Sequence, residues 1–164
     1  MKHHVSKDTK SKFNILGIYQ IAGGVLGIGL TIWAIIKLTY VPAILFLLFT
    51  ISFLLYAYSI FCGTLLLKRN TTELGHSLIN QLFQLVSFSI LGFTYQYISG
   101  FYISAGFHFA NQLNFTFNLG ISSWQISIND STEPIALNFN FVALAIILFI
   151  RKLRKKLQFE KVER

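Results

Sequence analysis

The apolar residues of this chain gather in four long blocks, at residues 13–36, 42–67, 77–106 and 134–150. A helix that crosses a bilayer needs about 20 apolar residues. The first two blocks match that length, and the fourth is shorter but sufficient. The third is too long for one straight span, so we expect it either to project beyond the bilayer or to bend at Gly92 or Gly100. The pattern predicts four transmembrane helices.

Between the third and fourth blocks, residues 107–133 follow a different pattern. The stretch "NFTFNLGISSWQISIND" alternates apolar and polar residues, and a period of two is typical of a β-strand. "GISS" offers a turn that folds one short strand back on another, and an isolated hairpin is barely stable in water. Its apolar face therefore needs a support, and we expect either a cap on the bundle or a recognition surface made of Phe115, Phe117, Trp124 and Ile126.

The composition agrees with a membrane location. Of the 164 residues 54% are hydrophobic and 12% are charged, whereas soluble domains carry about 25% charged residues. We therefore expect an all-α integral membrane protein with one domain, residues 1–164, built as a four-transmembrane-helix bundle. Residues 107–133 form its short hairpin-like outer loop.

The positive charges predict the orientation. Thirteen of the 14 Lys and Arg residues lie in the tail 1–12, the 68–76 loop and the tail 151–164, and Lys37 stands alone on the other side. Cytoplasmic segments are enriched in Lys and Arg, so both termini are expected in the cytoplasm. Five cations follow the fourth block directly, and we expect them to contact anionic lipid: Arg151, Lys152, Arg154, Lys155 and Lys156.

Polar residues interrupt the third block at helical spacing. On a helix, Asn80, Gln84, Ser87 and Thr94 fall on one face, and Gln20, Gly24 and Gly27 form a matching face in the first block. Small and polar residues allow close helix contact in lipid. We interpret this set as a helix-packing face. A polar pathway and a docking face for a partner subunit are the alternatives.

The sequence offers little catalytic chemistry. Cys62 is the sole cysteine, so no internal disulfide or Cys-x-x-Cys site can form. All six acidic residues lie outside the four blocks, which argues against a proton-coupled transporter. We find no catalytic motif, cofactor site or metal site, and we expect no enzyme activity and no nucleic-acid binding.

These observations favour a non-enzymatic accessory or structural subunit of a larger membrane assembly, with other membrane proteins as partners. A small transporter or channel-like protein for a neutral substrate, a membrane immunity protein and a homo-oligomer are the alternatives. The Ile-, Phe-, Asn- and Lys-rich composition is typical of a bacterial chain from an AT-rich genome. The expected location is therefore the bacterial inner membrane.

Overall fold

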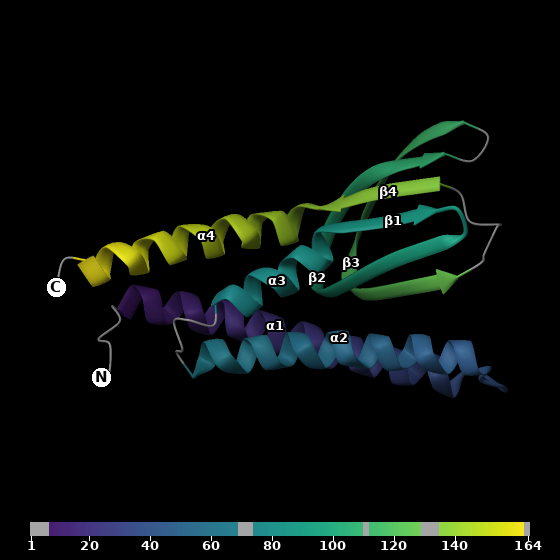
Figure 1. Cartoon of the computed structure of the whole chain (residues 1–164), viewed down its shortest axis with the longest axis horizontal. Helices are drawn as coiled ribbons and strands as arrows, with labels where there is room; N and C mark the ends of the chain where they lie inside the picture. The colour runs from purple at the N-terminus through teal and green to yellow at the C-terminus, as the bar shows by residue number, and fades with distance from the viewer. Residues whose placement is uncertain (1–6, 69–73, 110–111, 129–134, 163–164) are drawn as a thin grey trace.

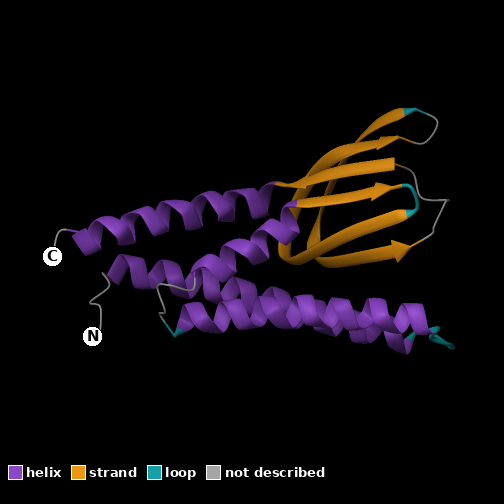
Figure 2. Ribbon diagram, viewed as in Figure 1, coloured by secondary structure: helices purple, strands orange, loops and turns teal. Residues whose placement is uncertain are grey.

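The computed structural model describes residues 7–68, 74–109, 112–128 and 135–162, with side chains from residue 9 to residue 158 within these ranges. The elements occur in the order α1 (Lys7–Ile36), α2 (Ala43–Leu67), α3 (Leu74–Leu85), β1 (Val86–Ile90), β2 (Phe93–Phe109), β3 (Leu113–Ile128), β4 (Ile135–Asn140) and α4 (Phe141–Val162). Figures 1 and 2 show the helices and the sheet lying along the same long axis.

Helices α1 and α2 form a closely packed antiparallel pair. A Cβ added to Gly17 would lie 2.9 Å from the Gly63 carbonyl oxygen, and one added to Gly24 would lie 2.7 Å from that of Tyr56. At the far end of the contact, the Thr31 and Ser52 hydroxyls are 3.1 Å apart. The glycines therefore allow close approach of the two backbones, and beyond them the Thr31 and Ser52 hydroxyls form a hydrogen bond between the helices.

The expected four-helix bundle is wrong. Among the described residues, two helices are long and apolar enough to cross a membrane, Thr9–Ile36 and Ala43–Leu67, and they match the first two apolar blocks. The blocks at 77–106 and 134–150 each combine helix and strand, and the fold is a mixed α/β arrangement with a four-stranded antiparallel sheet.

The third block changes its periodicity after Leu85. Asn80 and Gln84 are four residues apart and lie on α3, whereas "VSFSI" alternates from residue to residue and forms β1. The two glycines at which we expected a helix to bend have positive φ angles instead. Gly92 belongs to the tight turn between β1 and β2, and Gly100 lies in a β-bulge between Ile98 and Phe101.

The long strands β2 and β3 bend so that their hairpin encloses the other two strands. Residues 93–95 of β2 pair with β1, residues 104–109 pair with β4, and β1 also pairs with β4, all antiparallel. These pairings are compatible only if β2 reverses direction at its bulge. The two halves of the β2–β3 hairpin therefore flank the central β1–β4 pair, as Figure 1 shows.

The outer loop also differs from the expected hairpin. Residues 113–128 are strands as predicted, but they form one continuous strand, β3, whose partner is β2. "GISS" makes no hairpin turn. Its Ser122 has a φ of 32° and lies where β3 bends along with the β2 bulge.

The fourth block begins as strand β4 and becomes helix α4 at Phe141. The Asn140 side chain caps this helix, because its Oδ1 accepts hydrogen bonds from the backbone N–H groups of Val142 and Ala143 at 3.0 and 3.3 Å. The helix continues through the basic residues to Val162. What the sequence presented as a basic tail is the second half of a helix.

One apolar cluster joins the four helices at the end of the molecule where α1 begins and α4 ends (Figure 1). Its buried members come from all four helices: Phe13, Leu16, Leu66, Leu74, Ile150, Leu153 and Leu157. Fully burying one such side chain contributes about 1.5–3 kcal/mol in water. The cluster fixes α3 and α4 against the α1–α2 pair.

The sheet contacts α1 at Gly23. A Cβ at this position would lie 2.6 Å from the Ser99 carbonyl carbon and against the Gly100 nitrogen. We predict that Gly23→Ala lowers the free energy of unfolding by about 1–3 kcal/mol, because backbone at the bulge cannot yield to the new methyl group.

Gly29→Ala is the matched control. An added Cβ at Gly29 meets nothing within 4 Å, so this change on the same helix should be neutral or stabilising by up to about 1 kcal/mol. Thermal unfolding in detergent measures both variants. Equal stability of the two would contradict the close contact between α1 and β2.

Candidate functional site

The most distinctive site is the bulged corner of β2, residues 98–101, together with the polar side chains that surround it. A bulge interrupts the ladder and leaves backbone groups without strand partners. Buried backbone groups need hydrogen bonds, and here side chains supply them.

Two backbone N–H groups of the corner are bonded by side chains. The Ser99 N–H donates to Gln84 Oε1 of α3 at 2.8 Å, and the Gly100 N–H donates to Ser122 Oγ of β3 at 3.0 Å. The Ser122 hydroxyl in turn donates to the Gly23 carbonyl of α1 at 3.0 Å. Gln84 and Ser122 are both buried.

Two tyrosines bond the carbonyl groups on either side. The Tyr56 hydroxyl of α2 donates to the Ile98 carbonyl at 3.3 Å, and the Tyr19 hydroxyl of α1 donates to the Phe101 carbonyl at 2.9 Å. The corner is thus held by α1, α2, α3 and β3 at once.

Ser59 of α2 is the centre of the adjoining polar core. Its hydroxyl donates to the Gln20 carbonyl at 3.0 Å, and it receives hydrogen bonds from Asn80 Nδ2 at 3.1 Å and Ser99 Oγ at 2.9 Å. The Tyr97 hydroxyl lies 3.2 Å from Asn80 Oδ1. These groups are neutral hydroxyls, amides and carbonyls, so the core suits neutral polar partners.

Two amides of the core differ from the rest. Gln81 of α3 is fully buried, and neither its Oε1 nor its Nε2 has a hydrogen-bond partner among the described residues. Gln20 Oε1 accepts from Ser77 at 3.2 Å, but Gln20 Nε2 has no partner there either. A buried amide without a partner costs about 1–3 kcal/mol.

The strand pairing places most polar residues of the sheet on one face and most apolar residues on the other, and Ile98, which pairs with Ser123, is an exception. The strand pairing places these polar or small residues on one face: Ser87, Ser89, Thr94, Gln96, Ser104, Gly106, His108, Asn114, Thr116, Asn118, Ser123, Gln125, Ser127, Ala136 and Asn138. The opposite face carries Val86, Phe88, Phe93, Tyr95, Tyr97, Phe101, Ile103, Phe107, Phe115, Phe117, Leu119, Ile121, Trp124, Ile126, Leu137 and Phe139.

Over the central strands, burial on the two faces is the reverse of that in a water-soluble sheet, although Asn118 on the polar face of β3 is exposed. Ser87, Ser89 and Ser104 are buried, whereas the side chains of Phe115 and Leu119 are each 67% exposed. Part of the apolar face does pack, since the Trp124 ring lies 5.2 Å from that of Phe49 on α2. Tyr97 on the same face is also buried, whereas Phe101, Phe107 and Ile121 are exposed.

The predicted packing residues fall into two groups. Gln20, Asn80 and Gln84 belong to the polar core, and Gly24 and Gly27 lie against Tyr56 of α2. Ser87 and Thr94 are on strands instead of a helix. Ser87 pairs in register with Asn138, and the Thr94 hydroxyl bonds Ser89 at 2.9 Å.

The predicted recognition residues share the apolar face of β3, with Phe115 and Phe117 exposed and Trp124 and Ile126 half-buried. The five predicted lipid-contacting cations all lie on α4 beyond Ile150. Their roles in recognition and in lipid binding stay predictions.

Sequence reasoning missed Tyr19, Ser99 and Ser122, which complete the corner. The signal available was the dipeptide Ser99-Gly100 within an apolar stretch, since glycine inside a strand often marks a bulge.

Among the described residues, no group of three or more His, Cys, Asp or Glu side chains is placed to hold a metal ion. No family model, curated protein or solved structure matches the chain.

Gln84 and Gln81 allow a direct test of the corner, because both are buried glutamines of α3. We predict that Gln84→Leu lowers the free energy of unfolding by about 1–3 kcal/mol, since it leaves the Ser99 N–H without an acceptor. Gln81→Leu removes no hydrogen bond and should leave stability unchanged or raise it. Thermal unfolding of the two variants in the same detergent measures both effects. A larger loss of stability from Gln81→Leu than from Gln84→Leu would contradict the proposed role of Gln84 at the corner.

Proposed function

We propose that this chain is a non-enzymatic membrane subunit whose sheet lies in the lipid beside α1 and α2 and pairs with a different protein along β3. The observation that carries the proposal is the reversed sidedness of the sheet, together with the single partner of its edge strand.

The position of the sheet along the helices supports placement in lipid. Its corner contacts Gly23 near the middle of α1, and its far part lies beside the second half of α1 and the first half of α2 (Figure 1). If α1 and α2 cross a bilayer, the sheet beside them is at the depth of the outer hydrocarbon. A lipid-facing apolar side and a polar inner side are the pattern of β-structure in membranes.

Element lengths support the same placement. Helix α3 has 12 residues and β1 has 5, which together extend about 35 Å. The hydrocarbon core is about 30 Å thick. The whole composite segment is therefore, like the 25-residue α2, long enough to extend through the hydrocarbon.

The charges support an orientation with both termini in the cytoplasm. The start of α1, the end of α2 and the end of α4 share one end of the molecule (Figure 1), and the Lys- and Arg-rich segments adjoin them. At the other end, the Lys37 ammonium lies 5.6 Å from the centre of the Trp33 ring, an arrangement suited to a membrane surface.

Cysteine labelling tests this orientation. In a Cys62→Ser background, Thr39→Cys should react with an impermeant maleimide added outside intact cells, and Gln158→Cys should not. Both positions are exposed. Labelling at Gln158 from outside would contradict the orientation.

The edge of β3 supports a partner. Among the described residues, β3 pairs with β2 on one side and with no strand on its other side. Lipid offers no hydrogen bonds to an unpaired backbone, so open sheet edges do not face hydrocarbon. Residues 113–121 therefore need a further strand.

A second copy of this chain is a poor occupant of that edge. The sequence LNFTFNL at residues 113–119 reads the same in both directions, so two copies could pair antiparallel residue by residue. The two-fold axis of such a pair is perpendicular to the strands, which run along the helices (Figure 2). One copy would then be inverted in the membrane, and the distribution of positive charge opposes this. We therefore propose a different chain as the partner.

Two adjacent residues of β3 test both parts of the proposal. Phe117 lies on the apolar face and Asn118 on the polar face, and both are exposed. Phe117→Lys places a charge toward lipid at a cost of about 2–4 kcal/mol, so its membrane level should fall. Asn118→Lys should insert normally but block strand addition, because an inward-pointing charge protects a sheet edge from pairing.

Native mass spectrometry after gentle purification measures whether Asn118→Lys blocks binding of the partner. We expect the unmodified chain to carry another protein in fixed ratio and the Asn118→Lys chain to lack it. Normal membrane levels of Phe117→Lys would contradict lipid exposure, and an unaffected complex in Asn118→Lys would contradict pairing at β3.

A pathway for a neutral solute is the second candidate, favoured by the uncharged polar face of the sheet and the adjoining core. Proteoliposomes containing the chain alone should then admit glycerol faster than protein-free vesicles. The subunit proposal predicts no difference.

A further inference from the structure

A basic hollow runs along α4 where the helix passes from apolar to charged residues. It measures about 580 Å³, and its lining residues all belong to this helix: Leu148, Arg151, Lys152, Arg154, Lys155 and Gln158. We propose that this hollow binds the phosphodiester head of an anionic phospholipid, with Arg151 and Arg154 holding the phosphate and Leu148 contacting an acyl chain.

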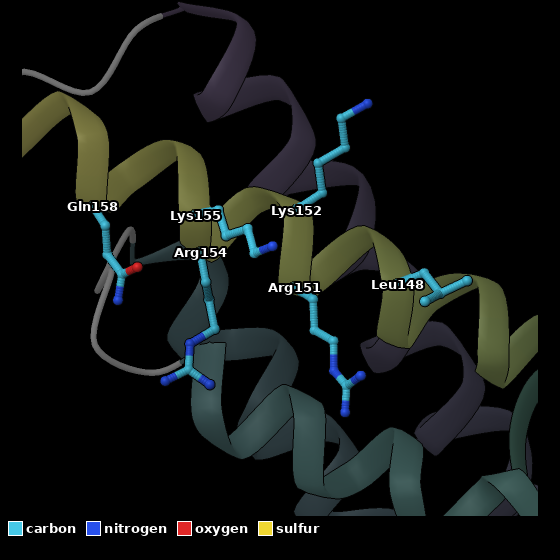
Figure 3. A pocket seen from close by; sticks show the side chains of 6 residues that line it. All are labelled: Leu148, Arg151, Lys152, Arg154, Lys155 and Gln158. Atoms are coloured by element: carbon cyan, nitrogen blue, oxygen red, sulfur yellow. The ribbon is translucent and has the colours of Figure 1, made fainter.

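The spacing of the residues supports one binding site rather than scattered charge. Arg154, Lys155 and Gln158 follow Arg151 by three, four and seven residues. All four residues therefore share one side of the helix. In Figure 3 the Arg151 and Arg154 side chains project to the same side of α4, and Lys152 projects to the other. Two guanidinium groups on one side can grip a phosphate from two directions.

The helix that carries these residues is fixed. Ile150, Leu153 and Leu157 are buried at 0%, 3% and 9% exposure in the apolar cluster with α1, α2 and α3. The basic stretch is therefore anchored for two turns beyond Ile150 instead of moving as a loose tail. Because the backbone is already fixed, binding costs only the freedom of the two arginine side chains, which favours a specific ligand.

The order of chemistry along the hollow matches a lipid. Leu148 is 57% exposed and lies one turn before Arg151, on the side where α4 is apolar. An acyl chain and its phosphate have the same order, apolar and then anionic. None of the six lining residues is acidic. Free inorganic phosphate would use the arginines but leave Leu148 without a role.

This inference rests on the membrane placement proposed above but not on the partner subunit. It is therefore tested on the full-length chain alone, delipidated in detergent and incubated with phosphatidylglycerol or phosphatidylcholine. Native mass spectrometry reports how much of each lipid stays bound, and thermal unfolding reports whether a variant remains folded.

The decisive variant is Arg151→Lys/Arg154→Lys, which keeps the charge and removes the planar fork. We expect phosphatidylglycerol to bind at least about tenfold more weakly, because lysine cannot donate two parallel hydrogen bonds to a phosphate. Arg151→Gln/Arg154→Gln should lose it entirely. The control Lys10→Gln/Lys68→Gln removes two charges from the same end of the molecule and should retain it.

Three results would overturn the proposal. Unchanged binding in the lysine variant would mean that charge alone attracts the lipid. An equal loss of phosphatidylglycerol binding in the Lys10→Gln/Lys68→Gln control would also mean that charge alone attracts the lipid. Displacement of phosphatidylglycerol by an equal concentration of inorganic phosphate would mean that the hollow recognises a soluble anion. Because all four substituted residues lie outside the buried core, each variant should keep its unfolding temperature.

Discussion

The structure depends on how the bulged corner of β2 is bonded. At residues 98–101 the strand leaves its ladder, and α1, α2, α3 and β3 each contribute a side chain that bonds a backbone group of the corner. No charge is involved, so the bonds survive in an apolar medium, where unpaired N–H and C=O groups are costly. The corner both bends the sheet and attaches it to the helices.

Fixing the corner determines which way the sheet faces. With residues 98–101 held against α1 and α2, the strands extend along those helices (Figure 2). On the apolar face, Tyr97 and Trp124 contact α2, whereas the side chains of residues 115, 117, 119 and 121 are exposed. In water that arrangement would expose a row of phenylalanine and leucine side chains on β3. In lipid the same row is favourable, and Ser87, Ser89 and Ser104 of the opposite face are buried away from the hydrocarbon. The fold and the proposed membrane environment therefore support each other.

Part of this structure follows from the sequence. The lengths of the first two apolar blocks indicate α1 and α2, and strict alternation indicates the strand at 113–128. The strands at 86–90, 93–109 and 135–140 were missed because they lie almost entirely within the two apolar blocks that we interpreted as helices. In these strands the large apolar residues of one face alternate with small polar residues, so the block as a whole still contains many apolar residues. Ser87 and Thr94 also fit the helical spacing begun by Asn80 and Gln84, and this spacing hid the alternation of "VSFSI". The contacts that form the corner join residues far apart in the sequence, so the sequence pattern does not contain them.

The accessibility of spin labels on β3 tests the central claim most directly. Nitroxides attached at Phe115→Cys and Phe117→Cys, in a Cys62→Ser chain reconstituted into bilayers, report contact with oxygen, which concentrates in lipid, and with a polar nickel chelate, which stays in water. If the apolar face of the sheet lies in the hydrocarbon, both labels will be relaxed by oxygen and protected from nickel, as will a reference label at Leu47 on α2, which is 52% exposed. Strong relaxation by nickel at 115 and 117, with the Leu47 label still protected, would place the sheet in water and contradict the account.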